Sequence, residues 1–249
     1  MSYKIYKNSL NNQTSKNLFK LVLKSCLFYC PTIFKKNHIY KKNWVDQKFI
    51  NQMKDFRKKD KKRFSAMYDS LQISNELWKI AYDNKLYKIA EKFLNVKKDD
   101  LLVRGLSFRI DFPNDTRNSY GWHQDNAYDK YNLSSKNGAV LWIPLIDTNE
   151  KNGTLIIKPR SYQSTFKCSR LYSHGSKYKS KQILVMNKYL KKYKSKSINV
   201  KKNSALTTYS GTFHKSGINT SEQIRFTLVI RFNKLFSKDF LFFRNLKNF

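Results

Sequence analysis

Two of the four histidines in this chain stand where a single metal ion could bind both of them. His123 and Asp125 are two residues apart, so on an extended strand their side chains leave the same face and can share one ion. His214 follows a short apolar run typical of a strand, and it can supply a second imidazole from a neighbouring strand. Two histidines and one carboxylate form a facial triad that binds Fe(II) and leaves coordination positions open. His38 and His174 lie in basic, polar surroundings and are expected at the surface.

Residues 1–100 show the apolar spacing of helices. Apolar side chains recur at intervals of three and four residues in two stretches, which comprise Leu18, Val22, Cys26 and Tyr29, and then Leu77, Ile80, Ala81, Leu86, Ile89, Ala90 and Phe93. This spacing places them on one face of a helix. We therefore expect a helical N-terminal region that packs on the core of the protein.

Near Leu101 the spacing changes to alternation, which is typical of a half-buried strand. One set of alternate residues is apolar and comprises Leu106, Phe108, Ile110 and Phe112, whereas the opposite set comprises Ser107, Arg109 and Asp111. The stretch from Ile224 to Phe232 repeats the pattern, with Arg225, Thr227, Val229 and Arg231 opposite the apolar residues. We expect these two polar faces to line the interior of a barrel.

Further strands are expected between these two. Residues 139–146 are almost wholly apolar, which predicts a strand buried on both sides, and Pro144 would place its end near a sheet edge. The turn at 149–153 ends in an Asn-Gly pair, a strong hairpin signal, so residues 154–158 are expected to return as the partner strand. Residues 205–213 also have strand character.

The core is therefore expected at 101–235, followed by a C-terminal extension at 236–249. Within the core, residues 163–202 are rich in lysine and serine and are expected to form an excursion over the site, a candidate lid or insert. Tyr128 and Tyr131 lie on the polar loop after the His123 motif and are candidate substrate contacts. Arg109 is expected either to face the substrate or to pair with Asp111.

The formal charge of +33 is a feature of nucleic-acid-binding proteins. However, the lysines are spread along nearly the whole chain, and Asn, Ile, Tyr and Phe are abundant as well. An AT-rich coding sequence would give this usage, so we interpret the charge as mostly background and expect no specific nucleic acid as a partner. The charge still allows an anionic partner.

Three cysteines without a Cys-x-x-Cys pair favour a reducing compartment, so a cytoplasmic location is expected. The apolar stretch at 18–34 is interrupted by Lys20 and Lys24, and the remainder is too short to span a bilayer. We therefore expect no membrane span. No small-residue cleavage site follows the stretch, so we expect no signal peptide.

Five short segments together resemble one enzyme family. They are Gly121-Trp122-His123-Gln124-Asp125, Leu141-Trp142-Ile143-Pro144-Leu145, Asn152-Gly153-Thr154-Leu155, Pro159-Arg160-Ser161, and His214-Lys215-Ser216-Gly217-Ile218-Asn219 with Arg225. Their order and spacing over roughly residues 100–232 are similar to those of the phytanoyl-CoA dioxygenase (PhyH) family of Fe(II)/2-oxoglutarate-dependent oxygenases. The resemblance implies a mainly β fold with a double-stranded β-helix core, a cupin-like jelly roll. It also implies Fe(II) as the metal, with 2-oxoglutarate and O2 as cosubstrates.

The resemblance assigns roles to individual residues. His123, Asp125 and His214 would be the iron ligands of the catalytic centre. Arg225, eleven positions after His214, would hold the distal carboxylate of 2-oxoglutarate in a bidentate ion pair, for which a planar guanidinium is suited. Ser216 would add a hydrogen bond to that carboxylate.

Other positions either match the family's cosubstrate pocket or depart from its usual sequence. Gln124 and Trp142 match residues that line the cosubstrate pocket, and Arg231 is the alternative carboxylate clamp if the register of its strand is shifted. Where the family often has Pro-Gly-Ser-His, residues 159–162 read Pro-Arg-Ser-Tyr, which predicts a less permissive turn. Where the family often has Gly-Asp, residues 203–204 read Asn-Ser, which is expected to alter a turn only.

We expect a dioxygenase that hydroxylates a C–H bond of a small molecule and releases succinate and CO2. Asp125 is present, whereas related halogenases replace this carboxylate with a small residue, so hydroxylation is favoured. The basic composition allows an anionic or phosphate-bearing substrate. Two alternatives stay open: a nucleic-acid-binding β-barrel, whose affinity would fall steeply with salt, and a non-catalytic jelly-roll binding protein that would form no succinate. The sequence predicts no oligomeric state.

Overall fold

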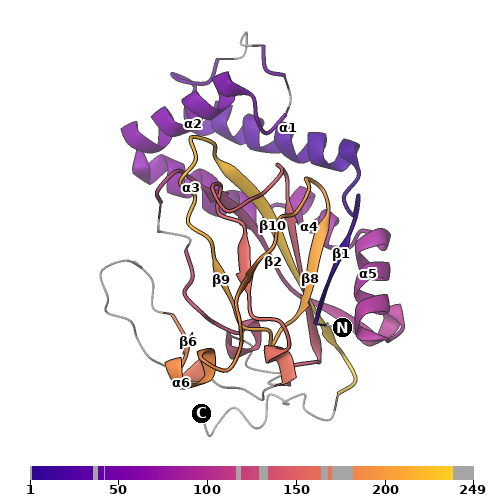
Figure 1. The fold of residues 1–249 in the computed structure, drawn as a ribbon. Helices are drawn as coiled ribbons and strands as arrows, with labels where there is room; N and C mark the ends of the chain where they lie inside the picture. The colour runs from indigo at the N-terminus through magenta and orange to yellow at the C-terminus, as the bar shows by residue number, and fades with distance from the viewer. Residues whose placement is uncertain are drawn as a thin grey trace, which may run out of the picture.

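An antiparallel five-stranded sheet forms the central layer of the molecule (Figure 1). The structure is a computed structural model that describes residues 2–35, 39–41, 43–115, 119–128, 134–163, 168–169 and 182–237. The strands stand in the order β1 (Tyr3–Tyr6), β8 (Ala205–Tyr209), β3 (Gly138–Pro144), β10 (Arg225–Lys234) and β2 (Leu101–Asp111). Every neighbouring pair is antiparallel, so segments far apart in the sequence lie side by side.

A smaller antiparallel sheet contains β7 (Lys196–Ser197), β4 (Leu155–Ile157) and β9 (His214–Ser216). One apolar cluster joins the two sheets, with Val140, Trp142, Leu206 and Val229 from the large sheet, Leu155 and Ile157 from the small one, and Ile198 and Val200 from the chain beside it. Two antiparallel sheets packed in this way form a jelly roll, so the expected fold class is confirmed. A separate short pair joins β5 (Cys168–Ser169) to β6 (Leu184–Val185).

Helices cover the other face of the large sheet (Figure 1). They are α1 (Asn12–Tyr29), α2 (Gln47–Lys59), α3 (Lys61–Gln72), α4 (Asn75–Ala81) and α5 (Asn84–Leu94). The remaining helical segments are α6 (Asn187–Leu190) and the 3-10 turns η1 (Lys98–Asp100), η2 (Asp125–Tyr128) and η3 (Ser161–Gln163). Among the described residues, none of the helices combines the length and the apolar character needed to cross a membrane.

Side-chain caps fix where these helices begin. Asp60 ends α2 with its own N–H, which donates to the carbonyl of Phe56, and its carboxylate accepts from the N–H of Arg63 to begin α3. Asn11, Asp46, Ser74 and Asp83 cap α1, α2, α4 and α5 in the same way. Each cap satisfies a backbone donor that lacks a partner inside the helix.

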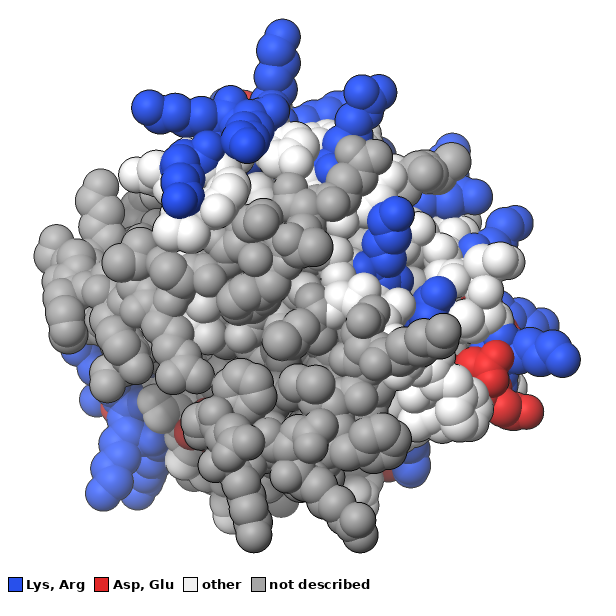
Figure 2. All heavy atoms as spheres, turned by 90° about the horizontal axis from the view of Figure 1, so that it is seen from below, with Lys and Arg blue, Asp and Glu red and all other residues white. Residues whose placement is uncertain are grey.

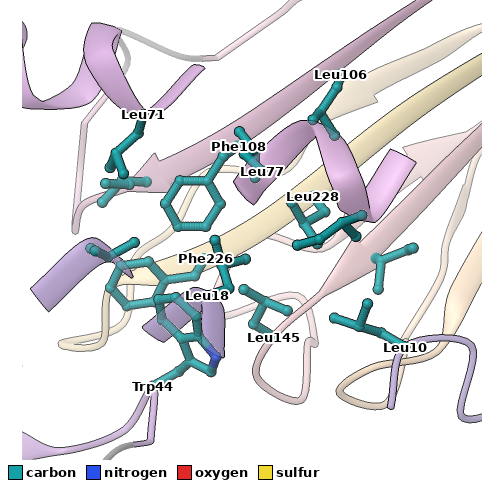
Figure 3. Packing of buried hydrophobic residues seen from close by; sticks show 14 of the residues in the cluster. Leu10, Leu18, Trp44, Leu71, Leu77, Leu106, Phe108, Leu145, Phe226 and Leu228 are labelled. Atoms are coloured by element: carbon teal, nitrogen blue, oxygen red, sulfur yellow. The ribbon is translucent and has the colours of Figure 1, made fainter. Parts of the chain in front are cut away.

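The main core lies between the helices and the large sheet, and it follows the alternation of the strands (Figure 3). Phe226 of β10 packs on Trp44, Phe49 and Phe108, at ring-centroid distances of 4.7, 6.1 and 6.3 Å. Leu106, Phe108, Ile110 and Phe112 of β2 face the same core, as do Leu228, Ile230 and Phe232 of β10. The predicted inward and outward faces of both strands are therefore confirmed.

Two expectations about strand pairing were wrong. Residues 154–158 do not pair with the preceding strand: β3 lies between β8 and β10, and β4 pairs with β7 and β9 in the other sheet. The turn itself is present, with Gly153 at φ 80°, but it carries the chain from one sheet to the other. Pro144 ends a central strand and lies at no sheet edge. The N-terminal strand β1 was not expected; it extends the sheet through β8.

The candidate lid at 163–202 falls partly outside the described residues. Of its described part, β7 belongs to the small sheet, and Ile198 and Val200 are buried in the cluster between the sheets. The end of this segment is thus built into the jelly roll, while the lid stays a prediction. Of the C-terminal extension, only residues 236–237 are described.

We expect Phe226→Ala to lower the free energy of unfolding by roughly 3–5 kcal/mol, because it removes a fully buried ring from an aromatic cluster. Urea denaturation followed by circular dichroism measures the change. The matched control is Phe28→Ala, since that ring is 78% exposed and its loss should change stability by about 0.5 kcal/mol or less. Equal effects of the two substitutions would contradict the described core.

The turn at Arg160 gives a second prediction. Arg160 is exposed and has φ 68°, in the left-handed region where a Cβ is unfavourable. Arg160→Gly should therefore raise the free energy of unfolding by roughly 0.5–1 kcal/mol, after the extra chain entropy of glycine is subtracted. Arg160→Ala keeps the Cβ and should give no gain. The midpoints of urea denaturation of both variants test this, and a gain from alanine would refute the explanation.

Candidate metal centre

His123 and His214 face each other as an isolated antiparallel pair. The N–H of His123 donates to the carbonyl of His214 at 2.9 Å, and the N–H of His214 donates back at 3.1 Å. His214 is the first residue of β9, whereas His123 lies in the connection between β2 and β3. The two hydrogen bonds bring the imidazole centroids to 4.1 Å from each other.

Asp125 reaches the same point from a backbone that differs from the expected one. It is the first residue of η2, so the extended strand predicted through His123 and Asp125 was wrong. The tight turn nevertheless directs its carboxylate toward the two rings. One ligand atom from each of His123, Asp125 and His214 lies within 4.8 Å of the others, and all three residues are buried.

Hydrogen bonds to the backbone fix the tautomer of both rings. Nδ1 of His123 lies 2.8 Å from the carbonyl oxygen of Gly121, and Nδ1 of His214 lies 2.9 Å from that of Thr212. Because a carbonyl only accepts, each Nδ1 carries the proton and each Nε2 keeps a free lone pair. These Nε2 atoms lie 3.7 and 4.0 Å from Oδ1 of Asp125. Two imidazole nitrogens and a carboxylate oxygen, with the imidazole N–H groups already bonded, fit a divalent transition metal such as Fe(II).

Charge and burial set the protonation that a metal ion requires. Burial and, next, the neighbouring His214 lower the pKa of His123 to about 3. Burial raises the pKa of Asp125, but Arg231 and the two histidines outweigh this and hold it below its usual range. Arg231 Nε lies 3.2 Å from Asp125 Oδ2, and Nη2 donates to Oδ1 at 3.3 Å. A neutral His123 and an ionised carboxylate are thus present at neutral pH.

A cavity of about 690 Å³ opens beside the triad. Its wall includes four of the residues proposed from the sequence as cosubstrate or substrate contacts: Arg109, Tyr128, Trp142 and Ser216. Ser216 Oγ accepts from the N–H of Tyr120 at 3.2 Å, and the Tyr128 hydroxyl accepts from the N–H of Ile183 at 2.9 Å. Tyr131 lies outside the described residues.

Gln124 and Arg225 lie behind this wall. Gln124 is fully buried and its side-chain amide donates to the carbonyl of Gly211 at 2.8 Å, so it supports the turn before β9. Arg225 is 3% exposed; its Nη2 lies 2.9 Å and its Nε 3.3 Å from Oδ2 of Asp111. Arg109 contacts the other oxygen of Asp111 at 3.2 Å and also lines the cavity. The two alternatives for Arg109, pairing with Asp111 and facing the cavity, therefore occur together.

Sequence reasoning missed several members of the site. Asp111 was assigned to Arg109 alone, although β2 and β10 place it directly opposite Arg225. From the sequence, Arg231 was considered only as an alternative clamp. Its contact with Asp125 joins β10 to η2, and no sequence spacing predicts that contact. Tyr120, which lines the cavity, has its ring centroid 5.2 Å from that of His123. Its position next to the His123 motif was the only available signal.

The fold and these side chains define a jelly-roll protein with a two-histidine, one-carboxylate metal site. The family model for phytanoyl-CoA dioxygenase (PhyH) matches residues 36–227. The chain belongs to this family. No curated protein matches it.

Solved structures share the fold at low sequence identity. The non-heme alpha ketoglutarate dependent epimerase SnoN from nogalamycin biosynthesis has a TM-score of 0.58 and 10% identity, over 94% of this chain and 78% of its own. The non-heme monooxygenase ThoJ, as its Ni complex, has a TM-score of 0.53 and 14% identity, over 94% and 74%. EvdO2 from Micromonospora carbonacea var. aurantiaca has a TM-score of 0.49 and 17% identity over 67% of this chain, which spans 62% of EvdO2.

The protonation of His123 can be tested in the metal-free protein. We expect its ring to stay neutral from about pH 8 to about pH 5, because burial holds its pKa near 3. In the unfolded chain the same ring takes up a proton near pH 6.5, so the stability due to this difference falls as the pH drops from about 6.5 toward 3. NMR titration of the histidine signals, with His123→Gln to identify the one that is lost, measures this. A His123 signal titrating near pH 6.5 would contradict the described burial.

Proposed function

We propose that this chain is an Fe(II)- and 2-oxoglutarate-dependent dioxygenase that hydroxylates a C–H bond of a small molecule. The observation that carries the proposal is the buried triad of His123, Asp125 and His214, with both Nε2 atoms free and directed at one carboxylate oxygen. Membership in the PhyH family supports the same reaction type. When bound, iron and 2-oxoglutarate supply the oxidising chemistry, with O2 consumed and succinate and CO2 released.

The cosubstrate's distal carboxylate would bind at the Arg109, Asp111 and Arg225 cluster. The cluster contains two guanidinium groups and one carboxylate, so it keeps one net positive charge in a buried position. Arg225 would share its planar donors between Asp111 and the cosubstrate. Ser216 accepts from the backbone of Tyr120, which leaves its hydroxyl proton available for a carboxylate oxygen.

Aromatic side chains shield the metal centre. The ring centroids of Tyr120 and Tyr128 lie 5.2 and 6.0 Å from that of His123, and Trp142 forms part of the cavity wall. These rings would limit the access of water to the triad and form one side of the substrate pocket. Gln124 acts through the turn before β9, so its role is to position His214.

Hydroxylation is favoured because the third protein ligand, Asp125, is present and held by Arg231. SnoN is described as an epimerase, so product analysis must separate hydroxylation from inversion of a stereocentre. Nucleic-acid binding has less support: on the face shown in Figure 2, the lysine and arginine side chains are dispersed around the described part and do not gather in one patch. Such dispersion is expected if the charge is background.

Anaerobic titration of Fe(II) and 2-oxoglutarate into the purified protein tests the proposal. We expect a weak visible charge-transfer band at about 500 nm, of the kind Fe(II) chelates give. His123→Ala should abolish it because a metal ligand is lost. Arg225→Lys, which keeps a charge but not the planar fork, should weaken 2-oxoglutarate binding by roughly tenfold or more.

The control is Lys88→Met, which removes one exposed charge. Lys88 belongs to α5, on the helical side of the large sheet, so the band should be unchanged. Unfolding midpoints of all variants show whether each is folded. Iron-loaded protein that gives no band and forms no succinate on addition of O2 would overturn the proposal. Retention of the band in His123→Ala would overturn the assignment of the ligand.

A further inference from the structure

One stretch of the cavity wall has no side chain to fill it. Gly105 lines the cavity, and a Cβ built there would meet nothing within 4 Å. Its φ lies outside the left-handed region, so its backbone does not require glycine. At each other glycine for which contacts are described, a Cβ would lie at 3.0 Å or less from another atom. The missing side chain at Gly105 therefore opens space in the cavity and does not relieve a crowded turn.

A β-bulge places two arginines beside this space. The register of β2 and β10 pairs Arg231 with Gly105, then Phe232 with Val103, so Arg104 is the extra residue. Val103 packs on the helical side of the sheet, and Arg104 lines the cavity. Simple alternation would have put Arg104 on the opposite face. The bulge thus adds a second guanidinium to the wall next to Arg231.

Arg231 uses only one side of its guanidinium on the metal centre. Nε and Nη2 contact the carboxylate of Asp125. Nη1 points the other way, 3.5 Å from the hydroxyl of Ser107, which also lines the cavity. A planar guanidinium can bind one carboxylate at one edge and a second anion at another. Arg231 can therefore connect a metal ligand to an anionic group in the space beside Gly105.

The charge of the cavity favours such a group. The charged side chains that line it, within the described part of the chain, are Arg104, Arg109, Arg231 and Asp125. Arg109 and Arg231 pair with Asp111 and Asp125, so part of this charge is balanced within the protein. Arginines nevertheless outnumber carboxylates in the wall, and an excess of positive groups favours an anionic group on the substrate.

We infer that the space beside Gly105 is a subsite for an anionic group of the substrate, a carboxylate or a phosphate, bound by Arg231, Arg104 and Ser107. This inference rests on the proposed function, whose substrate class it names. Arg104, Ser107 and Arg231 are not members of the cluster around Arg225, to which the proposed function assigns the cosubstrate. Because Arg231 also contacts Asp125, an anion held there keeps the remainder of the substrate close to the metal ion.

The experiment uses the full chain loaded with Co(II) in place of iron and saturated with 2-oxoglutarate. Methyl phosphate and carboxyl-labelled acetate are titrated separately at constant ionic strength, and paramagnetic relaxation of the phosphorus or carboxyl carbon is measured by NMR. Protein loaded with Zn(II) is the diamagnetic reference. We expect saturable relaxation enhancement for at least one probe, and the stronger probe identifies phosphate or carboxylate as the preferred group. No saturable enhancement for either probe would overturn the inference.

Substitutions at Gly105 separate the subsite from direct metal binding. Gly105→Phe fills the space and should weaken the preferred probe by roughly tenfold or more, with Gly105→Ala giving a smaller loss. Arg104→Met should also weaken it and does not depend on whether Gly105→Phe folds. Lys88→Met, the matched loss of one exposed charge, should bind the probe as the original chain does. Undiminished enhancement in Gly105→Phe and Arg104→Met would place the probe on the metal and overturn the subsite.

The two proposals fail in different ways. Protein that binds 2-oxoglutarate but gives no enhancement contradicts the subsite alone. Protein that binds Co(II) but not 2-oxoglutarate contradicts the proposed function. In that case the anionic probes can be titrated into protein loaded with Co(II) but without 2-oxoglutarate. Comparing the original chain with the Gly105→Phe variant under these conditions still tests the anion subsite.

Discussion

The two backbone hydrogen bonds between His123 and His214 are the contact on which the metal centre depends. They join the connection after β2 to the first residue of β9, so the two rings come from distant parts of the chain. Each ring is then oriented by the carbonyl two residues before it, that of Gly121 or Thr212. Because backbone groups fix both the separation and the tautomer of the rings, the site has its ligand geometry before any metal binds.

The inward face of β10 carries charges that a buried interior accepts only with partners. Arg225 lies against Asp111, and Arg231 lies against Asp125. Removing one member of such a pair leaves the other buried and uncompensated, which costs several kcal/mol. The outward face of the same strand is apolar, with Phe226 in the main core. One strand therefore anchors the helices on one side of the sheet and supplies the charged groups of the cavity on the other.

Alternation on β10 and on β2 from Leu106 onward was sufficient to predict which side chains point inward, because a period of two assigns faces without knowledge of the neighbouring strands. Strand pairing could not be predicted in the same way. An Asn-Gly turn describes the local backbone, but whether the chain returns to the same sheet depends on a free edge, and β3 has β8 and β10 on its two sides. The edge strand β1 was missed because its four residues are stabilised by β8, from the other end of the chain.

The candidate site shows the same limit at the level of single residues. The motif around His123 and the later His214 were enough to predict which residues form the triad, although the extended backbone expected at Asp125 was wrong. The bulge at Arg104 was not predictable, because an extra residue in one strand exists only relative to its partner. Its effect is large: it turns Val103 toward the helices and Arg104 toward the cavity. The residue that the bulge adds to the proposed subsite thus owes its direction to a contact between strands, whereas the two histidine rings are oriented by carbonyls of their own segments.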